Sequence, residues 1–203
     1  MFEPTMDGGV SGWISAGEAE LLRTLIGPVM DLLSTDRKPD SAPADTKLAE
    51  KTPVDTRPTD TKDDDDVFAD LERMFDAVAP QTPEDPALAR LLPDAYRDDP
   101  EAAGEFRKYT ESSLREAKKY FAQTLLETLP EQGGSFQLTA DQARDWMRAL
   151  NDIRLLFGVR LEVTEDFEDQ LAALDPEDPA VPMFEVYGWL GGVQESLIQA
   201  IAG

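Results

Sequence analysis

Apolar residues recur at the spacing of an α-helix along most of the chain. The first such pattern follows Ser15 and Glu18, which have the spacing of a capping box at a helix N-terminus. Pro28 lies inside this pattern and should kink the helix or split it into two pieces. The apolar positions that predict a stripe facing the core are Leu21, Leu22, Leu25, Ile26, Val29, Leu32 and Leu33.

The longest pattern runs from Glu101 to Leu129 and predicts one long helix. One face of this helix is rich in aromatic residues, and the small residues Ser113 and Ala117 within it predict a close crossing by another helix. We therefore expect this face to be packed. Its residues are Phe106, Tyr109, Ser113, Ala117, Tyr120, Phe121, Thr124 and Leu125.

Further helices are indicated by capping residues and by shorter apolar stripes. Asp85 is a candidate N-cap followed by Pro86, and Thr139 with Gln142 forms a second capping box. The helical segment that begins at Ala140 runs to about Phe157. Val159 to Val163 can continue it or leave it as a strand, and we favour a helix that continues into Glu165 to Leu174. The other predicted helices cover Val67 to Val78, a turn or two up to Leu92, and Met183 to Ile201.

Two short segments alternate like strands. They are Val10–Ile14 and Ser135–Leu138, and each is the best pairing partner that the chain offers the other. The predicted fold is therefore all-α: a helical bundle with at most a minor two-stranded β element.

A segment between the first helix and the rest of the chain has a different composition. Residues 36–66 combine four prolines with Asp, Thr, Lys and Ala and contain almost no large aliphatic side chains. Such a segment buries too little apolar surface to fold, so we expect a long disordered, acidic and Pro-rich insert. The predicted organisation is an N-terminal arm and first helix (1–35), this linker (36–66) and the remainder of the same helical domain (67–203).

Composition excludes several kinds of chemistry. The 203 residues contain no histidine and no cysteine, which removes serine–histidine catalysis, thiol catalysis and structural zinc. The formal charge of -23 disfavours direct nucleic-acid binding and anionic membrane surfaces, because both need clustered Lys and Arg. It suits a basic protein partner or simply solubility. We expect a cytoplasmic protein without a cofactor.

One charged pattern is a candidate site. Asp145, Arg148 and Asp152 recur at spacings of three and four on the helix that begins at Ala140, and Asn151 and Arg154 extend them sideways. A solvated helix face explains the pattern most simply. A recognition surface and a buried Asp–Arg clamp between helices remain open.

Two other groups of residues are better explained by structure than by chemistry. The acidic cluster Glu165–Asp169 could bind a hard cation or form an acid–base pair, but such clusters arise by chance in a chain with 42 acids. Trp13, Trp146 and Trp189 each lie on an apolar stripe, so we interpret them as core residues.

Several motifs together resemble a known family. The segment from Asp85 to Arg97, with Arg90, Asp94 and Tyr96, is similar to a signature of an actinobacterial family of formerly unknown function. The similarity continues in Ala117–Lys118, Leu125–Pro130, Gly133–Gly134, Leu138–Thr139, Trp146 with Asn151–Leu155 and Gly158–Val159, Tyr187–Leu190 with Gln194–Glu195 and Leu197, and Gly17–Leu22.

This resemblance implies a function. Members of the family are described as transcriptional regulators that respond to oxidative stress and are thought to act with an extracytoplasmic-function sigma factor. Redox sensing in the family is attributed to a cysteine pair, which this chain lacks, so a thiol switch is impossible here. The implied partner-binding residues come from the motif and from the charged helix. They are Arg90, Asp94, Tyr96, Arg97, Asp145, Arg148, Asn151, Asp152 and Arg154.

Three hypotheses follow for the function. The first is a non-enzymatic regulator that contacts a sigma factor or RNA polymerase through an acidic helical surface. The second is a small-ligand module or an enzyme that uses carboxylates and Tyr96, Tyr109 or Tyr120 in a pocket between helices. The third is self-association, for example as a homodimer, through the glycine-lined closing helix.

Overall fold

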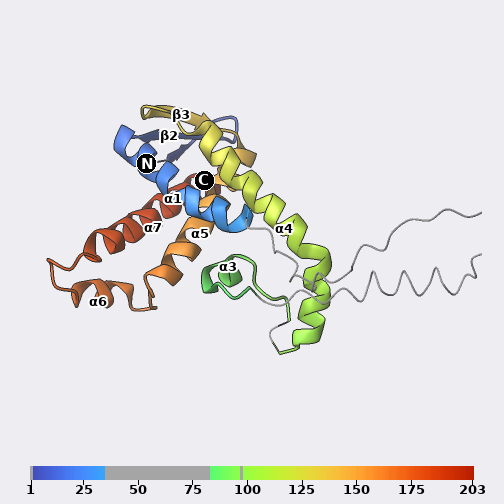
Figure 1. Ribbon diagram of the computed structural model, residues 1–203. Coiled ribbons are helices and arrows are strands. Elements are labelled where there is room, and N and C mark those ends of the chain that lie inside the picture. The colour runs from blue at the N-terminus through green and yellow to red at the C-terminus, as the bar shows by residue number, and fades with distance from the viewer. Residues whose placement is uncertain (1, 35–82, 97) are drawn as a thin grey trace, which may run out of the picture.

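The protein is described by a computed structural model that covers residues 2–34, 83–96 and 98–203. The predictions of an insert over 36–66, of a helix over Val67 to Val78, and for Arg97 lie outside these described residues. Within them the chain is mostly helical, as predicted (Figure 1). The helices are α1 (Ala16–Ser34), α3 (Pro86–Leu91), α4 (Pro100–Thr128), α5 (Ala140–Arg160), α6 (Phe167–Ala172) and α7 (Val181–Ala202).

A small antiparallel sheet lies at one end of the helices, where both chain termini also lie (Figure 1). Its strands are β1 (Phe2–Pro4), β2 (Val10–Ile14) and β3 (Gly134–Leu138), in the order β1-β2-β3. The predicted pairing of β2 with β3 is confirmed, with Gly12 opposite Phe136. The expectation of at most two strands is wrong. Strand β1 has only three residues and ends at a proline, too few to show the alternation by which a strand is recognised.

Helix α1 begins as predicted and ends later than its proline suggested. The Ser15 amide and hydroxyl both donate to the Glu18 carboxylate, while the Glu18 amide donates to the Ser15 hydroxyl, so the capping box is present. Pro28 does not split the helix, which continues to Ser34.

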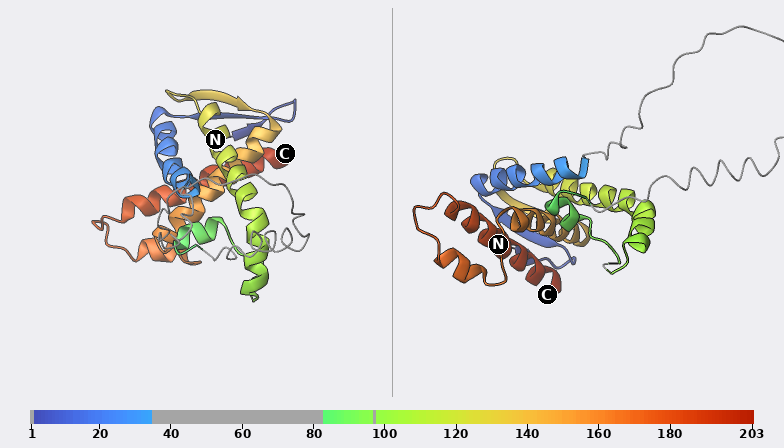
Figure 2. Two further views of the ribbon diagram at one scale, coloured as in Figure 1. Left: turned by 45° about the vertical axis from the view of Figure 1, so that its right-hand side comes forward. Right: turned by 60° about the horizontal axis from the view of Figure 1, so that its bottom comes forward.

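Helices α1 and α4 lie side by side and each supplies an arginine to the other's C-terminal end (Figure 2). Arg23 of α1 donates to the carbonyls of Leu129 and Pro130, just after α4. Arg115 of α4 donates to the carbonyls of Leu32 and Leu33 in the last turn of α1. Neither helix has a basic residue in its own last turn, so each arginine offsets the negative end of its neighbour's dipole.

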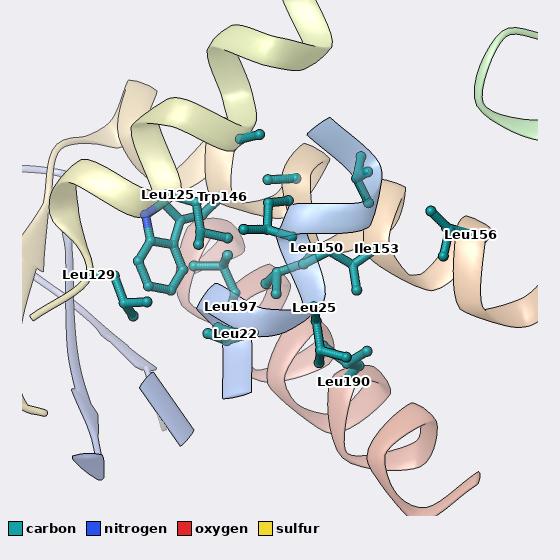
Figure 3. Packing of buried hydrophobic residues seen from close by; sticks show 14 of the residues in the cluster. Leu22, Leu25, Leu125, Leu129, Trp146, Leu150, Ile153, Leu156, Leu190 and Leu197 are labelled. Atoms are coloured by element: carbon teal, nitrogen blue, oxygen red, sulfur yellow. The ribbon is translucent and has the colours of Figure 1, made fainter. Parts of the chain in front are cut away.

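Helix α5 is the centre of the core and contacts α1, α3, α4 and α7. Its Trp146, Leu150 and Ile153 are fully buried (Figure 3). The Trp146 indole N–H donates to the Thr128 hydroxyl at 2.7 Å, which satisfies the polar atom of the largest buried side chain. Residues from 2–34 and from 83–203 contribute to the same hydrophobic cluster.

The C-terminal end of α5 differs from the prediction. The helix stops at Arg160 instead of running on into the Glu165–Leu174 segment, and α6 is a separate helix of six residues. Glu162 has φ 51°, a left-handed conformation that no helix continues through. The predicted acidic cluster lies just before α6 and in its first turn, and its members Glu165, Asp166, Glu168 and Asp169 are all exposed.

The tryptophans have three different environments. Trp146 is a core residue as predicted, and Trp189 packs half-buried against the core. The prediction is wrong for Trp13, which is 59% exposed. It follows Gly12 on β2, and because successive side chains of a strand point to opposite faces, Trp13 lies on the face away from the core.

Among the described helices, none combines the length and the apolar composition that crossing a membrane requires.

Gly133 and Gly27 provide a matched test of the fold. Gly133 has φ 72°, and a Cβ there would lie 2.5 Å from the Ala16 amide nitrogen, so Gly133→Ala should destabilise the protein by about 1–3 kcal/mol. A Cβ on Gly27 inside α1 would meet nothing within 4 Å, so Gly27→Ala should stabilise it by about 0.5–1 kcal/mol. Urea unfolding measures both. Equal effects would contradict the close approach at Gly133.

Candidate functional site

Helix α4 directs four charged side chains toward the protein and leaves several of its aromatic side chains exposed. Arg107, Glu111, Arg115 and Lys118 recur at spacings of four, four and three, which places them along one face. Their side chains are only 5%, 16%, 17% and 14% exposed. The part of α4 that faces the protein over three turns is therefore built from ions, and Ala122 and Leu125 continue it as an apolar surface.

Arg107 ties the loop after α3 to the first half of α4. Its guanidinium forms an ion pair with Asp94, donates to the Leu92 carbonyl at 3.1 Å, and pairs with Glu111 at 3.1 Å. Burial acts to lower the pKa of Arg107, but the hydrogen bonds to Asp94 and Glu111 outweigh it and raise that pKa. Arg107 is thus a permanent positive charge in a buried position.

Arg115 extends this network to α1. It pairs with Glu111 at 2.8 Å, so Glu111 lies between two arginines, and its other contacts are the α1 carbonyls described above. Burial acts to raise the pKa of Glu111, but the hydrogen bonds from Arg115 and Arg107 outweigh it and lower that pKa.

Lys118 forms the link from α4 to α5. Its ammonium lies 2.5 Å from Oδ1 of Asp152, which is 2% exposed. Burial raises the pKa of Asp152, an effect that the hydrogen bond and charge of Lys118 oppose. In the part of the chain that the structure describes, Oδ2 of Asp152 has no hydrogen-bond partner, so the carboxylate depends on Lys118.

The opposite face of α4 carries the aromatic stripe. Phe106, Tyr109 and Tyr120 are 47%, 69% and 61% exposed, and Ser113 is exposed too. The prediction that this face is packed is therefore wrong for its first half, and only its C-terminal Thr124 and Leu125 are buried. The aromatic periodicity was misleading because paired ions occupy the protein-facing positions.

The charged pattern predicted on α5 does not form one continuous ladder. Arg148 donates to Asp145 at 3.1 Å and lies over the ring of Phe121, 4.9 Å from its centroid, while its own side chain is half exposed. Asp152 bonds to Lys118 instead. Asp145 and Asp152 are both buried, so the simplest expectation, a solvated face, is wrong for these two residues.

Arg154 and Asn151 diverge from this group. The Arg154 guanidinium donates to the Gln194 side chain at 2.6 Å and lies 5.4 Å from the Tyr187 ring centroid, so it holds α5 to α7. Asn151 is exposed.

The predicted residues near α3 are also separated by their environments. Arg90 is exposed, and Asp94 is the half-buried partner of Arg107. Tyr96 is 51% exposed, and its ring meets that of Phe106 edge-on at 6.1 Å. The structure therefore brings Tyr96 to one end of the aromatic stripe and Arg148, through Phe121, to the other end. Arg107 and Lys118 were missed as site residues, although their charge pattern at helical spacing was a visible signal.

We define the candidate site as the exposed α4 stripe with its two flanking residues: Tyr96, Phe106, Tyr109, Tyr120 and Arg148. Exposed Tyr, Phe and Arg side chains on a rigid helix are typical of the centre of a protein interface. Among the described residues, no three acids gather in a way that could hold a metal ion.

A known protein family and proteins from mycobacteria resemble this chain over most of its length. Residues 1–201 match the family model described as Domain of unknown function (DUF2017). The chain is 34% identical over 199 residues to a protein named "Oxidative stress regulator AosR" from Mycobacterium tuberculosis (strain ATCC 25618 / H37Rv), covering 92% of this chain and 79% of that protein. It is 39% identical over 134 residues to "Putative oxidative stress regulator AosR" from Mycobacterium leprae (strain TN), covering 60% of each. No solved structure matches it significantly.

A double-mutant cycle tests the buried Lys118–Asp152 pair. Lys118→Met should destabilise the protein by about 3–5 kcal/mol, because it leaves a buried carboxylate without its cation. Adding Asp152→Leu removes that carboxylate, so the double variant should be more stable than Lys118→Met alone. Urea unfolding at neutral pH measures the free energies. If the effects of Lys118→Met and Asp152→Leu on the free energy of unfolding add up to that of the double variant, the two ions are not coupled.

The pH dependence of stability tests the Arg107–Glu111–Arg115 network. The pKa of Glu111 is lower in the folded protein than its ordinary value of 4.5, so its contribution to stability is present above that value and is lost as the pH falls through the folded pKa. Between about pH 5 and about pH 3, wild type should lose more stability than Glu111→Gln, which lacks this group. Thermal unfolding measures both proteins. An equal loss of stability in wild type and in Glu111→Gln would contradict the ion pairs of Glu111.

Proposed function

The chain belongs to the DUF2017 family and has relatives named as oxidative stress regulators, and on that premise we propose that it is a non-enzymatic regulator of the oxidative stress response. It acts in the cytoplasm by contacting the transcription machinery, with an extracytoplasmic-function sigma factor or RNA polymerase as its protein partner. It does not bind nucleic acid directly.

The observation that carries this proposal is the exposed aromatic stripe of α4. Tyr109 and Tyr120 are each more than half exposed although they lie on a helix whose other face is fully engaged in ion pairs. Burying such a stripe against a partner removes apolar surface from water without requiring any rearrangement of the fold. The formal charge of -23 favours a partner with a basic surface.

Of the residues predicted from the sequence, Tyr96 and Arg148 belong to this proposed contact surface. Arg90 and Asn151 are exposed and can extend it along α3 and α5. Asp94, Asp145, Asp152 and Arg154 support the surface from inside, because their side chains are engaged with other parts of the protein.

The alternative of an enzyme or ligand module with a tyrosine-lined pocket has less support. Tyr96, Tyr109 and Tyr120 lie on the outer surface of the molecule and not in a pocket between helices. A cavity on another part of the molecule, lined by the sheet, α1 and α7, is separate from these tyrosines.

Binding to purified components tests the proposal. Wild-type protein should bind an extracytoplasmic-function sigma factor or RNA polymerase from an actinobacterium in biolayer interferometry. Tyr109→Ala and Tyr120→Ala should each weaken that binding by about tenfold or more, since truncating an aromatic hot spot costs about 2 kcal/mol. Both side chains are exposed, so unchanged thermal unfolding should accompany the loss.

Met6→Ala is the control, because Met6 is fully exposed in the hairpin turn between β1 and β2, away from α4. Its binding should equal that of wild type. Wild-type affinity in both tyrosine variants would remove the α4 stripe from the interface, and no binding to any sigma factor or polymerase would overturn the proposed partner.

A further inference from the structure

A cavity of about 310 Å³ lies between the sheet, the start of α1 and the second half of α7. Four aromatic residues line it, together with Glu18, Ser196 and three apolar or small residues: Phe2, Trp13, Phe136 and Trp189, and Ile14, Gly192 and Val193. This volume is at the lower end of the range for small-molecule sites, which span roughly 300–1,000 Å³. The cavity shares no residue with the α4 stripe.

The walls of the cavity are held in place by the fold. The Phe136 ring stacks on the buried Trp146 at 5.2 Å, and Phe2 meets both rings edge-on at 6.0 Å. Gly12 makes room for this arrangement, because a Cβ there would lie 2.7 Å from the Phe136 ring. The Phe2 amide also donates to the Ser196 hydroxyl at 3.0 Å, which ties β1 to α7 across the cavity. The Phe2 and Phe136 walls are therefore preorganised.

Glu18 gives the cavity a fixed negative charge. One carboxylate oxygen accepts hydrogen bonds from the Ser15 amide and hydroxyl, and the other accepts from the Trp189 indole N–H at 3.3 Å. The Ser15 hydroxyl, followed by the Ser15 amide, lowers the pKa of Glu18, so the group is ionised at neutral pH. Among the described residues, no lysine or arginine forms an ion pair with it, and no basic residue lines the cavity. The positive charge of the chain's N-terminus adds a smaller lowering of the Glu18 pKa.

These features together select the charge of a ligand. A neutral ligand would cover the Glu18 carboxylate and remove water from it without compensation, whereas a cation would compensate that loss. Aromatic faces attract cations through their quadrupole, and tryptophan does so best. Donation of the Trp189 indole N–H to a carboxylate increases the electron density of that ring and strengthens the attraction. A cation with apolar substituents also keeps favourable contact with the aromatic walls.

We propose that this cavity is a binding site for a small organic cation of the quaternary ammonium class. The aromatic walls surround the cationic head, Glu18 balances its charge, and the Ser196 hydroxyl is available to a polar group on the ligand. The site rests on α1, α7 and the sheet, and it does not depend on the function proposed for the α4 stripe.

Titration of the full chain with choline tests the site, with 3,3-dimethyl-1-butanol as the neutral ligand of the same shape. Choline should shift the indole N–H resonances of Trp13 and Trp189 in a saturable way while leaving that of the core Trp146 nearly unchanged. The neutral analogue should bind at least tenfold more weakly. No saturable shift with choline, or equal affinity for the two ligands, would overturn the proposal.

Two variants test the charge of Glu18 and the open space of the cavity separately. Glu18→Gln should lower choline affinity by about tenfold more than it lowers the affinity for the neutral analogue, because glutamine can keep the capping box but carries no charge. Its amide NH2 cannot accept from the Trp189 indole N–H, and the neutral analogue measures the effect of losing that hydrogen bond. Gly192→Leu should abolish binding, because Gly192 lines the cavity and a side chain there enters open space.

Gly191→Leu is the matched control for the second variant. Gly191 also has open space beside it on α7 but does not line the cavity, so this variant should bind choline like wild type. Wild-type affinity in Gly192→Leu, or an equal loss in both leucine variants, would show that choline binds elsewhere or that the effect is structural.

Discussion

A charged side chain that is removed from water must meet an opposite charge or a hydrogen-bond acceptor, and this requirement determines the packing around α4. Arg107 holds the loop after α3, Arg115 holds the last turn of α1, and Lys118 holds α5 through Asp152. Ion pairs and carbonyl contacts have direction, unlike contacts between apolar side chains, so they fix the rotation of α4 about its axis as well as its position. That rotation turns the aromatic stripe outward.

Helix α1 packs against α4, which carries the exposed stripe, and also lines the aromatic cavity. Helix α1 connects them, since Glu18 lies in its first turn at the cavity and the carbonyls of Leu32 and Leu33 lie in its last turn on Arg115. A chain without cysteine has no thiol to report oxidation, but it has a rigid helix between a ligand-sized cavity and the surface proposed to bind a partner.

The parts of the fold that local signals specify were predictable from the sequence. The capping boxes at Ser15 and Thr139, the long helix from Pro100 and the pairing of β2 with β3 all depend on neighbouring residues or on alternation. The orientation of α4 was not predictable in this way, because an amphipathic pattern shows two faces but does not show which one is buried. The partners of Arg107 and Lys118 decide that, and Lys118 meets its partner 34 residues further along the chain. The same limit applies to the cavity, whose Glu18 and Trp189 are 171 residues apart.

The exchange of arginines between α1 and α4 has an evolutionary consequence. Arg23 and Arg115 both bond to backbone carbonyls, which every sequence provides, so these two positions can stay arginine while the residues that they contact drift freely. Asp152 offers no such freedom, because its partner is a side chain. Among relatives, positions 118 and 152 should therefore change together or not at all, whereas arginine at positions 23 and 115 should not covary with the residues that supply its carbonyl acceptors.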